Sequence, residues 1–205
     1  MKKRFLPIPL ILLIPILLLI VVTLAGIYRF SLSDEEIRAK FPNHSGRHNE
    51  VMFSAFGLRT TNPWTIKVPE TQAFTFIDEI DVESGHASGQ YEDGEERGDV
   101  DIDMATLVQV DPARWVAIMT VSNQGSGVFY YMTSFAYDQF RKRMISEQAI
   151  LLGDRIVFEK LEVNANRIEV TIHKRDVGQP MSQEPSNMTT ILFELSEQEN
   201  LRQLN

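Results

Sequence analysis

Three aspartates at alternate positions, Asp99, Asp101 and Asp103, form the clearest group of possible metal ligands. On a strand their side chains would share one face, about 6.6 Å apart. Calcium takes several oxygens at about 2.3–2.6 Å, so these side chains would have to lean together. Met104 also stands where an EF-hand loop needs glycine. We therefore expect a solvated strand face, with a weak calcium site as the alternative. Four nearby acids could join such a site: Glu92, Asp93, Glu95 and Glu96.

His44 and His48 lie four residues apart. On a helix this spacing would put two possible zinc ligands on one face. Pro42 precedes the pair and Gly46 lies inside it, and both disfavour a regular helix. We therefore expect histidines of a surface loop.

Ser126 lies between Gly125 and Gly127, and this spacing differs from the G-x-S-x-G elbow of serine hydrolases. A tight structural turn explains the glycines without a nucleophile. Gly153, Asp154 and Arg155 are interpreted in the same way, as an ion pair and turn that open a strand. These residues form no recognisable catalytic or cofactor-binding group. Whether the protein is an enzyme therefore stays open, and a binding protein is favoured.

Two further stretches could contact a ligand or a surface. Five aromatic residues at strand spacing could line a ligand groove, although such residues more often form a core. They are Phe129, Tyr130, Tyr131, Phe135 and Tyr137. The basic run of residues 141–143 could touch a membrane, but firm anchoring by a polybasic segment uses about 4–8 charges.

The elements that must position these residues are mostly strands. Period-two patterns or β-rich composition predict strands at residues 64–68, 73–82, 99–110, 154–163, 167–173 and 189–195. Residues 114–122 and 128–137 are apolar on both faces, which predicts two central strands paired across the turn at 123–127. Residues 84–98 are rich in glycine and acids and predict a mobile loop. Residues 138–152 give no clear pattern, apart from the basic run at 141–143, which indicates a solvated turn or a short helix. Capping-box patterns predict short helices at 33–41 and 197–204.

The first apolar stretch, residues 5–28, contains no charged residue. A helix of this length spans roughly 36 Å, enough to cross a hydrocarbon core of about 30 Å. Lys2, Lys3 and Arg4 precede it, and the positive-inside rule keeps that end in the cytoplasm. We expect an uncleaved signal anchor, with cleavage near Thr23, Ala25 and Gly26 as the alternative.

The charge balance restricts the partners of the remaining chain. Residues 31–205 hold all 28 acidic residues and 16 of the 20 basic ones, a net charge of −12. Such a domain, taken as a whole, repels nucleic acid and anionic lipid head groups. There is no cysteine, so thiol chemistry and disulfides are excluded, and no cofactor is indicated.

Several short motifs between residues 124 and 195 resemble those of a family of uncharacterised exported bacterial domains, some of them lipoproteins. Residues 124–131 are similar to the family's GGSG-type segment, and residues 152–156 to its lGDR segment. Pro180-Met181 follows in the same order. Gln124 replaces the first glycine, and Ser182 stands where relatives often carry cysteine. The resemblance implies an exported β-rich domain and no established activity.

These observations predict one mainly β, antiparallel domain at residues 31–205, a sandwich or a strongly curved sheet with short flanking helices. It would follow a cytoplasmic tip and transmembrane anchor at residues 1–30. The expected function is binding, of an envelope protein or a small ligand, on the periplasmic or outer side of a bacterial membrane. The alternatives are an envelope hydrolase whose site assembles only in three dimensions, and a weak calcium-binding module.

Overall fold

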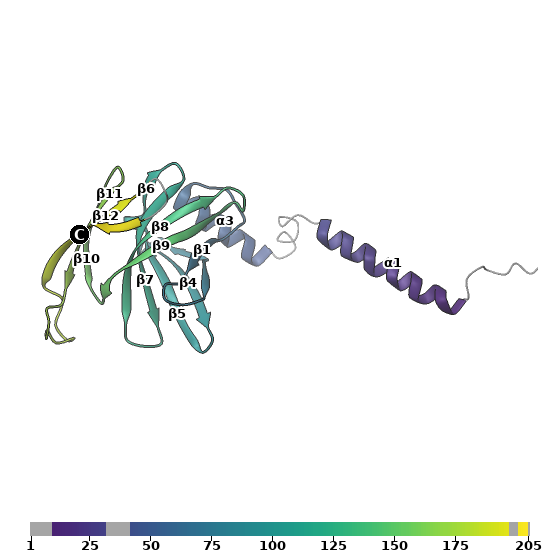
Figure 1. Ribbon diagram of the computed structural model, residues 1–205, viewed down its shortest axis with the longest axis horizontal. Coiled ribbons are helices and arrows are strands. Elements are labelled where there is room, and N and C mark those ends of the chain that lie inside the picture. The colour runs from purple at the N-terminus through teal and green to yellow at the C-terminus, as the bar shows by residue number, and fades with distance from the viewer. Residues whose placement is uncertain (1–9, 32–41, 197–200, 205) are drawn as a thin grey trace, which may run out of the picture. The chain divides into compact units, whose positions relative to one another are not determined.

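The computed structural model describes residues 10–31, 42–196 and 201–204 and divides into two units, residues 1–45 and 46–205 (Figure 1). In the first unit, α1 (Leu10–Ser31) contains Pro15, and its described side chains, residues 14–24, are exposed. Over the described part of the chain, no helix has both the length and the apolar character needed to cross a membrane. Lys2, Lys3, Arg4 and the predicted helix at 33–41 lie outside the described residues.

Helix α3 (Pro42–Phe56) corrects the expectation that His44 and His48 lie in a surface loop. Proline is well tolerated in the first turn of a helix, so Pro42 begins the helix and does not exclude it. An internal glycine such as Gly46 costs only about 1 kcal/mol. Burial of Val51 and Met52 in the domain core offsets this cost. Gly57, with φ of 68°, ends the helix by donating its N–H to the carbonyl of Phe53.

The first sheet is mostly antiparallel and curved. Its order is β2-β1-β9-β8-β7-β5-β4-β3, β6 pairs with β7, and β1 meets β9 in parallel at Thr65 and Ile145. The strands are β1 (Trp64–Lys67), β2 (Phe74–Ile77), β3 (Glu79–Asp81), β4 (His86–Asp93), β5 (Glu96–Asp103), β6 (Val108–Asp111), β7 (Arg114–Asn123), β8 (Val128–Asp138) and β9 (Arg143–Asp154), with a 3-10 turn, η1 (Met104–Thr106), between β5 and β6.

The two ends of this sheet nearly meet. β2 pairs with β1 and the adjoining β3 pairs with β4, so residues 74–81 bridge opposite ends of the strand order. Asp78 N–H donates to the Ser88 carbonyl over 3.1 Å, and Thr75 Oγ1 donates to the Gln90 carbonyl over 2.6 Å. The prediction of a strongly curved β domain is therefore confirmed, with β2 and β3 as the bridging segment.

The second sheet consists of β10 (Val157–Asn164), β11 (Arg167–Lys174), β12 (Asn187–Leu195) and β13 (Leu201–Leu204), in that order. The hairpin predicted around residues 164–166 is confirmed. The predicted terminal helix is wrong at residues 201–204, because Leu201 pairs with Leu195 and extends the sheet. Residues 197–200 lie outside the described residues.

One other sequence expectation is wrong. Residues 84–98 are not a loop for most of their length, because β4 and β5 form a regular hairpin that turns at Gly94. This hairpin buries Ala87 and Tyr91 despite its polar composition. The turn expected around the basic run is present at residues 139–142, whereas residues 143–154, for most of which the sequence shows no clear pattern, form the long strand β9.

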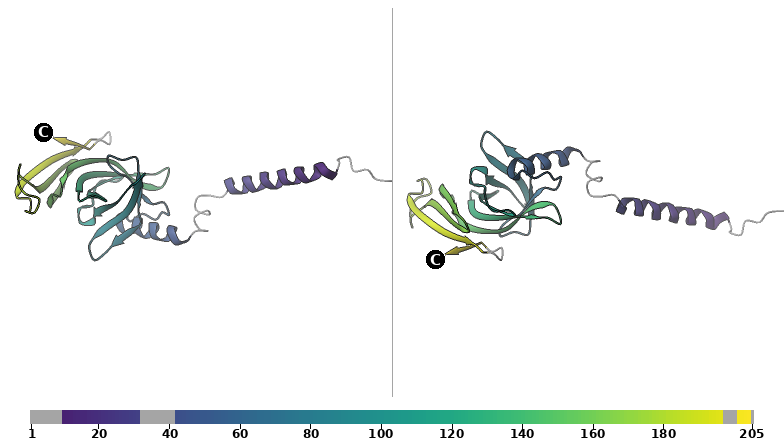
Figure 2. Two further views of the ribbon diagram at one scale, coloured as in Figure 1. Left: turned by 90° about the horizontal axis from the view of Figure 1, so that it is seen from below. Right: turned by 90° about the horizontal axis from the view of Figure 1, so that it is seen from above.

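Two apolar cores lie on opposite faces of β7 and β8. Trp115, Ala117 and Met119 face the interior of the curved sheet, while Val116 and Ile118 face the second sheet. This confirms the prediction that both strands are central and buried on both faces. The second sheet packs along one side of the curved sheet (Figure 2).

Candidate functional site

A hollow that combines a histidine, two aspartates and a tyrosine lies where the outer face of the curved sheet meets the start of β10. Its volume is about 400 Å³. We call it the intersheet groove. It is lined by His86, Asp101, Asp103, Ile118, Thr120, Val128, Tyr130, Ile156, Val157 and Phe158. The second sheet supplies one apolar wall, and the first sheet supplies the polar groups.

The polar groups stand in a row across four strands. Asp101 of β5 lies opposite Ser88 of β4 and Thr120 of β7, and Thr120 lies opposite Tyr130 of β8. Directly opposed residues have Cβ atoms about 4.5–5.5 Å apart. Their neighbours along the strands face the core, so strand alternation turns this row outward.

His86 and Asp101 form the titratable pair of the groove. A carboxylate oxygen of Asp101 is hydrogen-bonded to His86 Nδ1. The two side chains are 43% and 35% exposed, so a ligand can reach both. A carboxylate on one ring nitrogen fixes the orientation of the imidazole and directs Nε2 elsewhere. The pair can therefore offer a carboxylate oxygen and an imidazole nitrogen to a hydrogen-bonding group in the groove.

Tyr130 adds a hydrogen-bond donor to the groove. Burial raises the pKa of its phenol, and the negative charge of Asp101 raises it further. The hydroxyl therefore stays protonated at neutral pH. No lysine or arginine is among the described residues that line the groove, which carries the carboxylates of Asp101 and Asp103.

The three predicted aspartates share β5 but have different partners. Asp101 binds His86, Asp103 accepts the Ala105 N–H over 2.9 Å, and the exposed Asp99 accepts from Gln90 Nε2 over 3.3 Å. Asp101 and Asp103 line the groove, whereas Asp99 lies outside it. Within the described residues, no group of three or more His, Asp or Glu side chains is placed to hold a metal ion.

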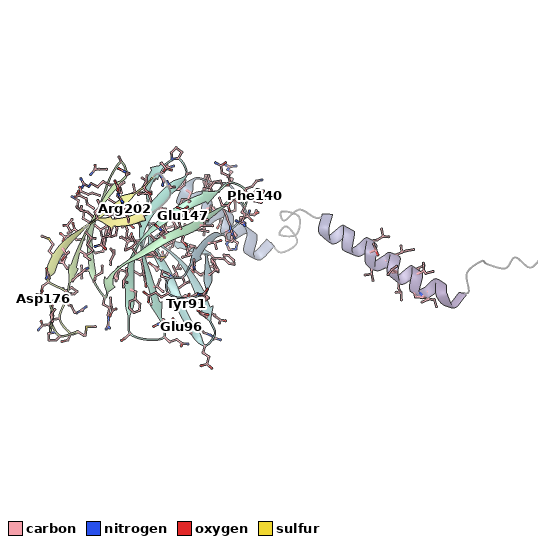
Figure 3. The ribbon with its side chains drawn as sticks, viewed as in Figure 1. Tyr91, Glu96, Phe140, Glu147, Asp176 and Arg202 are labelled. Atoms are coloured by element: carbon pink, nitrogen blue, oxygen red, sulfur yellow. The ribbon has the colours of Figure 1, made fainter. Side chains whose placement is uncertain are left out.

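The acids at the end of the β4–β5 hairpin also act separately. Glu92 pairs with Arg97 at 3.1 Å, and Asp93 accepts the Gln72 N–H. Glu96 accepts from the hydroxyl of Tyr91 at 3.0 Å (Figure 3). Burial, together with this hydrogen bond, raises the pKa of Tyr91 to about 12. The network holds the hairpin together.

The two glycine-containing motifs meet beside the groove. Asp154 accepts the Val128 N–H over 3.0 Å, and the Arg155 N–H donates to the Val128 carbonyl over 2.8 Å. Asp154 ends β9 and Arg155, with φ of 46°, forms the turn before β10, so the pair joins two strands and does not open one. Gly153 precedes the pair, and Val128 and Ile156, on either side of this junction, line the groove.

Ser126 is exposed in the β7–β8 turn, between Gly125 and Gly127. The Gly125 N–H donates to Asn123 Oδ1 over 2.9 Å, as expected of a structural turn. Ser126 is not among the residues that line the groove. Along the aromatic strand, Tyr131 and Phe135 belong to the core, as expected, while Tyr130 faces the groove.

His48 lies on α3, four residues after His44, and its ring packs edge-on against Phe76 with centroids 6.4 Å apart. The two histidines therefore share a helix, where a loop was expected.

Comparison with protein-family models, with curated proteins and with solved structures found no match for this chain.

Sequence reasoning identified Asp101 and Asp103, and it named Tyr130 among the aromatic residues that could line a ligand groove, but it did not locate the groove. The other polar members, His86 and Thr120, come from two further strands and share no motif. The sequence feature that could have indicated the groove is the position of Thr120 and Tyr130, whose polar side chains face outward on strands that are otherwise apolar.

Proposed function

We propose that this protein is a single-pass, membrane-anchored envelope protein whose exported β domain binds a small amphipathic molecule in the intersheet groove. The observation that carries the proposal is the lining of this groove. An apolar wall from β10 faces Asp101, His86 and Tyr130 on the curved sheet. Small-molecule sites combine an apolar surface with a few polar groups that orient the ligand. The ligand would have an apolar body and a cationic, hydrogen-bond-donating head.

The hydrogen bonding of the His86–Asp101 pair favours binding over catalysis. A hydrolase would use His86 as a base on a nucleophilic hydroxyl, within about 2.6–3.2 Å. Among the described residues, no hydroxyl group donates a hydrogen bond to His86, and the partner of the His86 ring is Asp101. A hydrolase that uses this pair is the second candidate. Hydrolysis of a p-nitrophenyl ester that disappears in His86→Ala but persists in the loop variant Ser126→Ala would favour it.

The proposed location is supported by the sequence. The uncharged apolar stretch at residues 5–28 follows Lys2, Lys3 and Arg4, and an acidic domain comes after it. If the protein is anchored and exported, it remains in membrane pellets after alkaline carbonate. A protease added to intact spheroplasts then removes the β domain. Recovery in the soluble cytosolic fraction would contradict this proposal.

A matched pair of probes tests the proposed ligand chemistry. We expect the full-length protein in phosphatidylcholine nanodiscs to bind 4-phenylbutylammonium in preference to 4-phenylbutyrate, which has the same apolar body and the opposite charge. Asp101→Asn should weaken ammonium binding by at least about tenfold, because a hydrogen bond to a charged group contributes about 1.5–3 kcal/mol. Titration calorimetry measures both affinities.

Asp99→Asn is the control, because Asp99 is on the same strand and face but outside the groove. It should leave binding unchanged. Equal affinity for the two probes, or equal effects of the two substitutions, would contradict the proposed site. A separate titration with millimolar calcium examines the calcium alternative, for which Asp99, Asp101 and Asp103 are the candidate ligands.

A further inference from the structure

Exposed aromatic rings and basic side chains lie together on two hydrogen-bonded segments of the β domain. The ring of Phe140 is 94% exposed and lies at the outer rim of the domain (Figure 3). Arg141 and Lys142 follow it and are also exposed. On the other segment, the guanidinium of Arg59 lies 5.5 Å from the centre of the Phe53 ring, which is 52% exposed. We call these five residues the basic–aromatic patch.

Hydrogen bonds between the two segments fix the patch. Thr60 Oγ1 donates to the Lys142 carbonyl over 2.7 Å, and Asn62 Nδ2 donates to the Arg141 carbonyl over 2.7 Å. The β8–β9 turn is held from within by Asp138, whose carboxylate accepts the N–H groups of Phe140 and Arg141 over 3.0 and 2.9 Å. Phe140 is therefore presented to solvent by a well-braced turn.

The charge of the patch is opposite to that of the rest of the domain. Residues 31–205 carry a net charge of −12, yet the patch contributes three cationic side chains. Within the described residues, Asp138 is an acid that borders the patch, and it pairs with Arg141 at 3.1 Å. Its side chain is only 15% exposed, whereas that of Arg141 is 62% exposed. A docking partner therefore meets positive charge and aromatic surface, which suits a negatively charged, partly apolar surface.

We propose that the basic–aromatic patch docks the β domain on anionic phospholipid of the membrane to which the chain is anchored. This inference rests on the proposed anchoring. Exposed phenylalanine rings of an interfacial segment can insert at the boundary between head groups and acyl chains, and each basic side chain near an anionic surface adds attraction. Three charges and two rings are too weak to hold a free protein firmly. An anchor in the same chain supplies a high effective concentration, so weak contacts suffice to orient the domain.

The test places a fluorescent reporter in the patch. Full-length protein carrying Phe140→Trp is reconstituted in nanodiscs of phosphatidylcholine with or without phosphatidylglycerol, using lipids brominated in the acyl chains. The native Trp64 and Trp115 are 0% and 7% exposed and form a constant background. Bromine quenching of the introduced indole should be about twofold stronger in the anionic discs, and Arg141→Glu should remove the increase. Val177→Trp is the control, because Val177 is fully exposed on the β11–β12 connection, away from the patch.

The outcomes separate the two proposals. Protein that fails to co-elute with nanodiscs contradicts the anchor. If the protein co-elutes but Phe140→Trp is quenched no more than Val177→Trp, the lipid contact alone is overturned. Quenching of Phe140→Trp that is equal with and without phosphatidylglycerol overturns the electrostatic part. If the reporter in Phe140→Trp is shielded only when an envelope protein extract is added, and not by anionic lipid, the partner is a protein and the inference is overturned.

Discussion

At the scale of single residues, Asp154 couples the β7–β8 turn to the junction between β9 and β10. Burial opposes its ionisation, but hydrogen bonds from the Arg155 side chain and the Val128 N–H lower its pKa below the usual value. We expect Asp154→Ala to reduce the free energy of unfolding by about 1 kcal/mol at pH 7, a low value because the side chain is 35% exposed. Urea denaturation followed by the fluorescence of the two buried tryptophans measures this loss.

The pH dependence of that loss has a defined sign. The folded-state pKa of Asp154 lies below the unfolded value of about 3.9, so the charged form stabilises the fold above that value. This contribution disappears as the pH falls through the lower, folded-state pKa. The difference between Asp154→Ala and the native protein should therefore be full at pH 7 and smaller near pH 3. Asp99→Ala should change stability by less than about 0.5 kcal/mol at both pH values. A loss from Asp154→Ala that grows on acidification would contradict this account.

At the scale of elements, composition predicted the strands whose side chains are apolar and missed those held mainly by pairing. β7 and β8 carry apolar residues on both faces, and that pattern predicted their central position. β4 and residues 96–98 of β5 contain two glycines and three acids, and only the later part of β5, residues 99–103, lay in a predicted strand. Their backbone hydrogen bonds form the hairpin, and side chains such as Tyr91 provide the little apolar burial it needs. The composition of this hairpin therefore resembled that of a loop.

Local signals failed where distant contacts decide the conformation. Ser196 and Glu199 fit a capping box, yet Leu201 is buried at 4% exposure and its N–H donates to Gln148 of β9. Pairing with β12 outweighs a helix preference of a few tenths of a kcal/mol per residue. The intersheet groove was unpredictable for the same reason, since it exists only where β10 meets the face of the curved sheet.

A substitution at Gly89 tests how the two ends of the curved sheet are held together. A Cβ atom at this position would lie 2.2 Å from the Phe76 carbonyl oxygen, so the bridging segment must approach β4 closely. We expect Gly89→Ala to separate β2 from β4 and to lower the free energy of unfolding by at least about 1–3 kcal/mol, the usual cost of overpacking. Hydrogen exchange should show faster exchange at the Asp78 N–H, which bonds to Ser88.

Gly125→Ala is the matched control for this change. A Cβ atom there would lie 2.9 Å from the side-chain oxygen of Asn123, which can move aside at an exposed turn. Its cost should stay below about 1 kcal/mol. Equal costs for the two substitutions would show that the close approach of Phe76 does not hold the sheet.

At the scale of the whole domain, one pair of strands serves two cores. Phe135 of β8 lies in the core of the curved sheet, while Phe193 of β12 lies in the core between the sheets, and both are fully buried. β7 and β8 contribute alternate residues to each core, so neither core can lose its packing without disturbing the strands of the other. The two sheets should therefore unfold together.

This coupling predicts the effect of a change in the second core on reporters in the first. Phe193→Ala should remove about 3–5 kcal/mol, as is usual for a buried phenylalanine. Both tryptophans belong to the first core. If the domain unfolds as one unit, their fluorescence transition shifts to lower urea concentration together with the circular dichroism transition.

Phe135→Ala should produce a similar shift, and the exposed Phe140→Ala almost none. A tryptophan transition that Phe193→Ala leaves in place would show that the second sheet unfolds independently. In that case the groove between the sheets would open before the curved sheet melts, and ligand binding would be lost at a lower urea concentration than tryptophan burial.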